Sequence, residues 1–63
     1  MTLREWCQEN RVRQVDVAVQ IGISPSAVAH LIAGRTLPSL ITAVAIEELT
    51  RGAVPCASWL AAA

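Results

Sequence analysis

The chain has 63 residues, enough for one small domain, and 54% of them are hydrophobic while 16% are charged. Five basic and five acidic side chains give a formal net charge of zero, a mild argument against nucleic-acid binding, because such binders are usually basic. No apolar run reaches the roughly 20 residues that cross a membrane, and no signal peptide is recognisable, so we expect a cytoplasmic protein with no membrane partner.

The side chains that usually carry catalysis are scarce. His30 is the only histidine and Asp16 the only aspartate, and there is no Lys or Tyr. Cys7 and Cys56 form no CxxC pair, and no cluster of metal-ligand spacing accompanies them. We therefore expect a protein that is not an enzyme and holds no metal or cofactor. The two cysteines are interpreted as small apolar side chains in a reducing cytosol, with a disulfide between the chain ends as the alternative.

The first helix is expected over residues 3–9. Thr2 and Glu5 have the spacing of a capping box, in which each residue bonds the backbone of the other and starts a helix. Three apolar side chains then share one face at i, i+3 and i+4 and are expected to pack inward. They are Leu3, Trp6 and Cys7.

Two further helices are expected on either side of a break at Gly22. The second covers residues 14–21 and ends at Gly22, since glycine reaches the left-handed conformation at low cost. Ser24 supplies an N-cap oxygen for the third helix and Pro25 its first position, and Gly34 closes it. The inward side chains of this unit are Val17, Ala18, Ile21, Ile23, Val28, Leu31 and Ile32.

A fourth helix is expected from Leu40 to about Thr50, after a loop at 35–38 and with Ser39 as its N-cap. Its expected inward side chains are Leu40, Ala43, Val44 and Ile46, and Gly52 ends it. The tail, 53–63, is expected to form a short helical turn that docks Trp59 and Leu60. The sequence thus predicts an all-α domain over 1–63 with four to five short helices.

Two short helices joined by a glycine-containing turn, here over about 14–33, are typical of the helix-turn-helix unit. Residues 11–39 resemble the DNA-binding core of the Cro and lambda-repressor type, the XRE-like family. The matching positions are Gln14, Val17, Ala18, Ile21, Gly22, Ile23, Val28 and Leu31, followed by the run GRTLPS. The ending IEELTRGAVP is similar to small Cro-like phage regulators and their antitoxin-like relatives. The resemblance implies a lambda-repressor-like fold that inserts helix 24–33 into the major groove of double-stranded DNA.

The resemblance also implies which side chains contact DNA. The positions that face the groove are held by Pro25, Ser26, Ala29 and His30. Gln14 resembles the family residue that hydrogen-bonds a phosphate, and helix N-termini favour anions in any case. Further candidates for phosphate contacts flank the motif: Arg11, Arg13, Arg35 and Thr36. A solvated surface position is the alternative for each of these polar side chains. Because family members often carry Gln, Asn or Arg at the groove positions, we expect DNA shape to contribute to selectivity.

An excess of apolar residues on the outer helix faces points beyond DNA. Val15 and Val19 lie at i and i+4 on a face of the second helix that is commonly polar, and Ile41 and Ala45 repeat the pattern on the fourth. Such a surface indicates a protein interface, to which Trp59 is a further candidate contributor. The alternative is that the tail folds back and covers this surface through Val54, Trp59 and Leu60.

Two functions are therefore weighed. The first is a sequence-specific transcriptional regulator, a phage or mobile-element repressor that acts as a homodimer on a palindromic operator, with no small-molecule ligand. Dimerisation is expected because one recognition helix buries too little surface for tight specific binding. The second is an antitoxin-like or other protein-interaction module that uses the same fold mainly to bind a protein partner.

Overall fold

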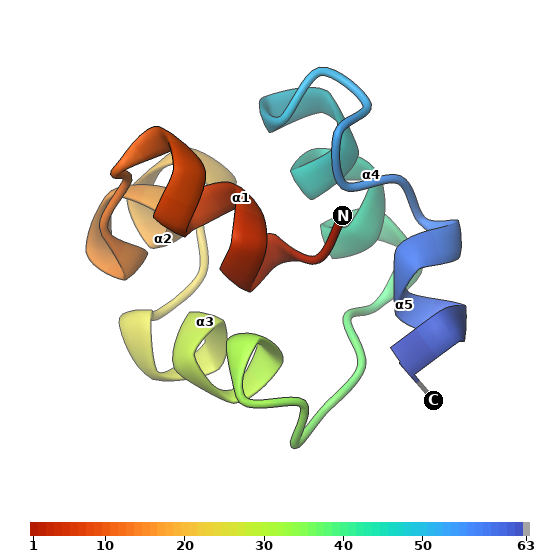
Figure 1. Ribbon diagram of the computed structural model, residues 1–63. Helices are drawn as coiled ribbons and strands as arrows, with labels where there is room; N and C mark the ends of the chain where they lie inside the picture. The colour runs from red at the N-terminus through yellow and green to blue at the C-terminus, as the bar shows by residue number, and fades with distance from the viewer. Residues whose placement is uncertain (63) are drawn as a thin grey trace.

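A computed structural model describes the backbone of residues 1–62 and the side chains of residues 1–59. The described part is all-helical and contains no strand, which confirms the predicted fold class (Figure 1). Its helices are α1 (Leu3–Asn10), α2 (Gln14–Ile21), α3 (Pro25–Ile32), α4 (Leu40–Leu49) and α5 (Ala57–Ala62). The limits of α2 are those the sequence predicted. For the other helices with predicted limits, the observed limits differ from the predicted ones by one or two residues at an end.

The start of α1 is the predicted capping box. The Thr2 hydroxyl accepts a hydrogen bond from the Glu5 backbone N–H at 3.2 Å, and the Glu5 carboxylate accepts one from the Thr2 N–H at 3.0 Å. These two bonds satisfy backbone donors that a helix start otherwise leaves without partners, and they favour the charged carboxylate. The pKa of Glu5 is accordingly lowered, chiefly by its hydrogen bond to the Thr2 backbone.

The break between α2 and α3 is the predicted tight turn. Gly22 has a φ of 85°, and its N–H donates to the Ala18 carbonyl at 2.8 Å. Two residues later the Ser24 hydroxyl accepts from the Ala27 N–H at 3.1 Å, and Pro25 is the first residue of α3. The chain thus ends one helix and starts the next within three residues, because only Ile23 separates the left-handed glycine from the serine cap.

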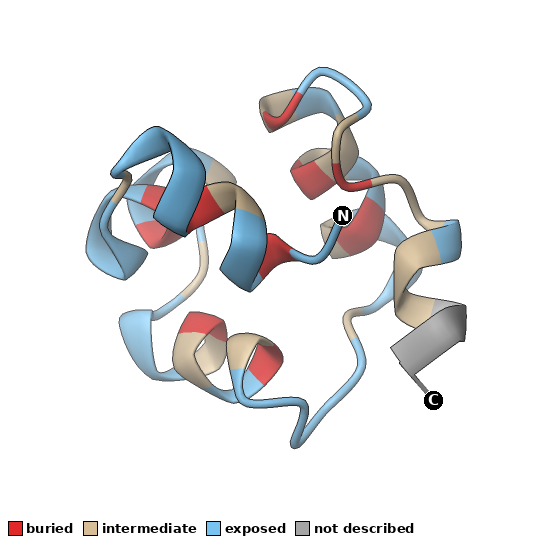
Figure 2. Cartoon of the chain, in the orientation of Figure 1, coloured by how far each residue is buried: buried red, intermediate tan, exposed pale blue. Residues whose placement is uncertain are grey.

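The core lies between α1, α2, α3 and α4, where the buried segments of these helices turn toward the middle of the molecule (Figure 2). It is built from aliphatic side chains, with Val17, Val28 and Ile46 fully covered. The complete buried apolar set is Leu3, Cys7, Val17, Ala18, Val28, Leu31, Ala43, Ile46 and Val54. Half-buried side chains packed against this core include the predicted Trp6, Ile21, Ile23 and Ile32. Cys7 and Cys56 are both free thiols, and burial raises the pKa of the Cys7 thiol.

The prediction for the inner face of α4 is wrong at two positions. Ala43 and Ile46 are buried as expected, but Leu40 is 76% exposed and Val44 is 40% exposed. Residues 40–46 are apolar or Thr throughout, so hydrophobic periodicity does not distinguish one face from another. Packing against the rest of the chain decides instead which side of α4 is buried. That side carries Ala43, Ile46 and, at the helix end, Thr50.

The tail is fixed to the C-terminal end of α4. The Thr50 hydroxyl donates to the Ile46 carbonyl at 2.8 Å and accepts from the Val54 N–H at 3.0 Å, which places the Val54 side chain in the core. The Glu47 carboxylate accepts from the Cys56 N–H at 3.0 Å. Trp59 then packs against the core from α5, as predicted, whereas the Leu60 side chain lies outside the described residues.

Candidate nucleic-acid interface

α2 and α3 form the two arms of the candidate interface. Their axes are bent by 115° at the turn, within the roughly 90–120° of a helix-turn-helix unit. The two helices pack directly on each other, and the buried Ala18 is small enough to allow this approach. The turn therefore fixes α3 as a rigid arm whose outer side is free of the rest of the chain (Figure 1).

The outer side of α3 presents three of the four predicted base-reading residues to solvent. Pro25, Ser26 and His30 are exposed, and Ala29 is half-buried. Ser26 and His30 are four residues apart, so they lie on the same face one turn apart. This face carries a hydroxyl and an imidazole, both able to donate or accept hydrogen bonds at base edges, beside the small apolar Ala29.

The start of α2 brings two phosphate candidates together. Gln14 is the first residue of α2 and is exposed, and Arg13 is its N-cap residue. The Arg13 guanidinium is already paired, because its Nε and Nη2 donate to the two Asp16 carboxylate oxygens at 3.1 and 3.3 Å. This pairing raises the pKa of Arg13. It is the only ion pair among the described side chains. Because both side chains are exposed and solvent screens their charges, the pair is weak and a phosphate can compete for the guanidinium.

The end of α3 holds Arg35 close to His30, on the outer side of that helix. Gly34 has a φ of 75°, and its N–H donates to the Leu31 carbonyl at 3.2 Å. The Arg35 N–H donates to the His30 carbonyl at 3.0 Å. These two hydrogen bonds together form a Schellman motif, which fixes the backbone of the residue after the glycine. Arg35 and the neighbouring Thr36 are both exposed, as is Arg11, which sits between α1 and α2 with a φ of 54°.

A family model described as helix-turn-helix matches residues 3–52 of this chain. The chain belongs to this family, the Cro and lambda-repressor type. No curated protein and no solved structure matches the chain. The protein is thus a DNA-binding regulator of the XRE type, in a family whose domains bind double-stranded DNA and are not enzymes. The family match covers α1 to α4 and ends before α5.

Arg4 is a further basic side chain near the motif that the sequence did not predict, because the predicted phosphate contacts all flank the motif along the chain. The structure places it on α1, where it lines the same shallow depression as Gln14 and Gln8. An exposed arginine beside the candidate phosphate-binding Gln14 adds a cation to this helix-turn-helix surface. Arg4 lies ten residues before Gln14 in the sequence, and only the packing of α1 brings the two side chains to the same depression.

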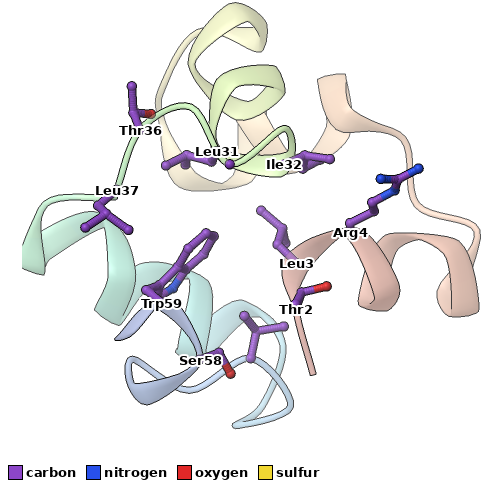
Figure 3. A pocket seen from close by; sticks show the side chains of 11 residues that line it. Thr2, Leu3, Arg4, Leu31, Ile32, Thr36, Leu37, Ser58 and Trp59 are labelled. Carbon is purple, nitrogen blue, oxygen red and sulfur yellow. The ribbon is translucent and has the colours of Figure 1, made fainter. Parts of the chain in front are cut away.

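A separate pocket of about 210 Å³ lies at the C-terminal end of α3. It is not lined by Ser26 or His30, the exposed side chains that define the α3 outer face. Leu31 and Ile32 of α3 face Leu3 of α1 and Trp59 of α5 across it (Figure 3). It is smaller than the roughly 300–1,000 Å³ of typical small-molecule sites.

Neither a metal cluster nor a membrane-spanning helix is found within the described residues. No group of three or more His, Cys, Asp or Glu side chains comes together there. No single described helix is long and apolar enough to span a membrane. The pair α2 and α3 passes that test by length and composition only when taken together, across its 115° bend.

Proposed function

We propose that this protein is a sequence-specific transcriptional regulator, a repressor of the phage or mobile-element kind that binds a palindromic operator as a homodimer in the cytoplasm. Residues 1–63 act as a single domain in this proposal, with the helix-turn-helix unit at 14–33. The observation that carries it is the α3 outer face, where Ser26 and His30 stand exposed on a helix held at 115° to α2.

The proposed contacts divide into base readers and phosphate binders. Ser26 and His30 read base edges, while Pro25 and Ala29 offer apolar contact to a thymine methyl group. Phosphate contacts, which fix register without reading sequence, are assigned to Gln14, Arg13, Arg35, Thr36 and Arg11. Of these, Arg35 is the strongest candidate, because its backbone is fixed next to His30 and no ion pair among the described side chains includes it.

Dimerisation follows from the small size of the reading face. An eight-residue helix with two hydrogen-bonding side chains on its outer side reads few base pairs, so two copies on a two-fold symmetric site are needed for tight binding. Occupation of a promoter by this dimer would then block transcription.

A protein-interaction module remains the second candidate function. The observation in its favour is the exposure of Val19 and Ile41 (74% and 83%), on a chain with zero net charge. A stable complex with another protein that forms equally well without DNA would favour this function over the first.

Selection from a random DNA duplex pool tests the proposed function directly. At about 0.1 M salt, where phosphate contacts still contribute strongly, the protein is expected to enrich a palindrome whose half-sites lie about one helical turn apart. Retention of DNA without sequence enrichment would contradict the proposal.

Arg35→Ala tests the phosphate contact within this site. The substitution is expected to weaken binding to all DNA sequences and to reduce the slope of log affinity against log salt by about 1, because one fewer counterion is released. Arg51→Ala is the control: Arg51 is an exposed arginine like Arg35, but it follows α4 at the far end of the family match. An equal effect of both substitutions would remove Arg35 from the interface.

A further inference from the structure

The shallow depression between α1 and the start of α2 combines a polar rim with an apolar base. The residues that line it are Arg4, Cys7, Gln8, Val12, Gln14 and Ile32. Arg4, Gln8 and Gln14 are exposed, whereas the other three are buried or half-buried. None of the described residues that line it is a carboxylate, so the guanidinium of Arg4 supplies the charge of the depression. This distribution of charge favours an anion.

α1 keeps its acidic side chains away from this depression. Arg4 and Gln8 are four residues apart and share the side of the helix that lines it. Glu5 and Glu9 are also four residues apart, but they lie about 100° further round the helix. The Glu5 carboxylate is in addition bonded to the Thr2 N–H. α1 therefore presents a cation and an amide to the start of α2, with its carboxylates on another side.

The Arg4 guanidinium is free to bind an anion. Arg13 is paired with Asp16, whereas no ion pair among the described side chains includes Arg4. Arg4 also lines the pocket at the end of α3, but its guanidinium points away from Leu31 and Trp59 of that pocket (Figure 3). A guanidinium presents a planar fork of N–H donors, which matches the oxygens of a phosphate group.

The start of α2 adds backbone donors beside the depression. The other three of the first four helices begin with a capping hydroxyl, from Thr2, Ser24 and Ser39. The N-cap residue of α2 is Arg13, whose side chain makes no capping bond. The N–H groups of Gln14 and Val15 make no hydrogen bond within the described part of the chain. Free N–H groups at a helix start favour an anion, and here they accompany a cation and two amides.

We propose that Arg4, Gln8 and Gln14 form one binding site for a backbone phosphate of DNA, with Arg4 as its cation. The inference rests on the proposed function for the source of the phosphate, and it extends the DNA contacts to α1. Gln14 and the free N–H groups donate from α2, while Arg4 and Gln8 donate from α1. The apolar base strengthens these bonds, because a lower local dielectric screens them less than water does.

The site is connected directly to the recognition helix. Ile32, the last residue of α3, lines the same depression and packs against the core. A phosphate contact carries no sequence information, but it fixes the register of the protein on the duplex. A phosphate held between α1 and α2 therefore positions α3 for base reading from the side opposite to Arg35, which follows the end of α3.

Salt titration of binding to a mixed-sequence duplex tests the site first, because phosphate contacts do not depend on sequence. Arg4→Ala is expected to reduce the slope of log affinity against log salt by about 1, since one fewer counterion is released. Arg4→Lys keeps the charge and is expected to keep the slope. Arg51→Ala removes an exposed arginine that does not line the depression and is expected to leave the slope unchanged. Circular dichroism checks the fold, and Arg4→Gln replaces an Arg4→Ala chain that unfolds.

Methylphosphonate substitution tests whether the three side chains bind the same phosphate. Each phosphate of the enriched operator is replaced in turn by a neutral methylphosphonate. At one position the replacement is expected to weaken binding of the natural chain by about tenfold, the value of a hydrogen bond to a charged group. The same replacement is expected to have a smaller effect on Arg4→Ala, Gln8→Ala and Gln14→Ala. Arg35→Ala is expected to stay fully sensitive to it, because Arg35 does not line the depression.

Three results would overturn the inference: an unchanged slope with Arg4→Ala, an equal decrease with Arg51→Ala, or no phosphate whose replacement loses its effect in both Arg4→Ala and Gln14→Ala. A site that binds inorganic phosphate but not DNA would give the first of these results. The proposed function fails separately. A slope reduced by Arg4→Ala without enrichment of any DNA sequence sinks the function and keeps the site. Enrichment of a palindrome with an unchanged slope keeps the function and sinks the site.

Discussion

The outer faces of α3 and α4 differ although the two helices begin in the same way. Each starts at a serine whose hydroxyl accepts from the backbone three residues on, and each buries a valine or isoleucine against α2. On α3 the outward positions carry Ser26 and His30 beside small residues. On α4 they carry Leu40, Ile41 and Val44.

The different side chains on the outer faces of α3 and α4 determine what each face can bind. Hydroxyl and imidazole groups exchange hydrogen bonds with base edges and are well solvated when DNA is absent. Large aliphatic groups gain nothing from a wet groove and gain about 25 cal/mol for each Å² that a protein partner removes from water. The chain thus carries a polar outer face on α3, which suits nucleic acid, and an apolar one on α4, which suits a protein partner.

Ile46→Ala against Ile41→Ala tests the two sides of α4 and carries the largest expected effect. Ile46 is fully buried, so its truncation leaves a cavity and is expected to lower the free energy of unfolding by about 2–5 kcal/mol. Ile41→Ala is expected to change the stability of the monomer by less than about 0.5 kcal/mol, because the side chain is exposed. Urea unfolding at low protein concentration measures both. Similar losses would show that the outer side of α4 is packed within the monomer.

Ser26→Ala combined with His30→Ala tests the α3 outer face. The double variant is expected to lose about 1–3 kcal/mol of discrimination between operator and non-specific DNA while keeping its thermal stability, since both side chains are exposed. Competition binding with operator and scrambled duplexes measures the discrimination. Ile41→Ala is the control on the other face and is expected to preserve the preference for a single half-site. Undiminished selectivity of the double variant would exclude these two side chains from base reading.

Ser24→Ala and Ser39→Ala compare the two helix starts. The Ser24 hydroxyl accepts from the Ala27 N–H at 3.1 Å, and the Ser39 hydroxyl accepts from the Thr42 N–H at 3.3 Å. Loss of either cap is expected to lower the free energy of unfolding by about 1 kcal/mol. Thermal unfolding measures this effect, and half-site DNA binding separates the two, because only Ser24→Ala alters the start of the recognition helix. Equal losses of DNA affinity would argue that both act through global stability alone.

Glu5→Gln probes α1, which packs on α3, and carries the smallest expected effect. The pKa of Glu5 is lowered in the folded chain, so its contribution to stability is present above its unfolded pKa and is lost as the pH falls through the folded value. Glu5→Gln is expected to reduce slightly the loss of stability between neutral pH and about pH 3. Melting temperatures across this range measure the change, with Glu9→Gln as the exposed control. An unchanged pH dependence would show that the charge of Glu5 does not contribute.

Local signals were sufficient for the helix-turn-helix unit. A glycine, a serine cap and a proline within four residues leave few backbone solutions, so residues 22–25 predicted the turn and the ends of both helices. The exposed positions on α3 followed from the same register. The chemical role of each of these side chains stays a prediction, since exposure alone does not show what a residue contacts.

By itself, therefore, the sequence determined the helices, their caps, the tight turn and the family, because each depends on neighbours within a few residues. Only the tertiary structure decided which side of α4 is buried, where the tail is fixed and that Arg4 lies beside Gln14. An apolar helix without a charged residue in its first two turns has no preferred inner face of its own. Its orientation is chosen by what the other helices offer for packing, and that choice leaves Leu40 and Ile41 in solvent.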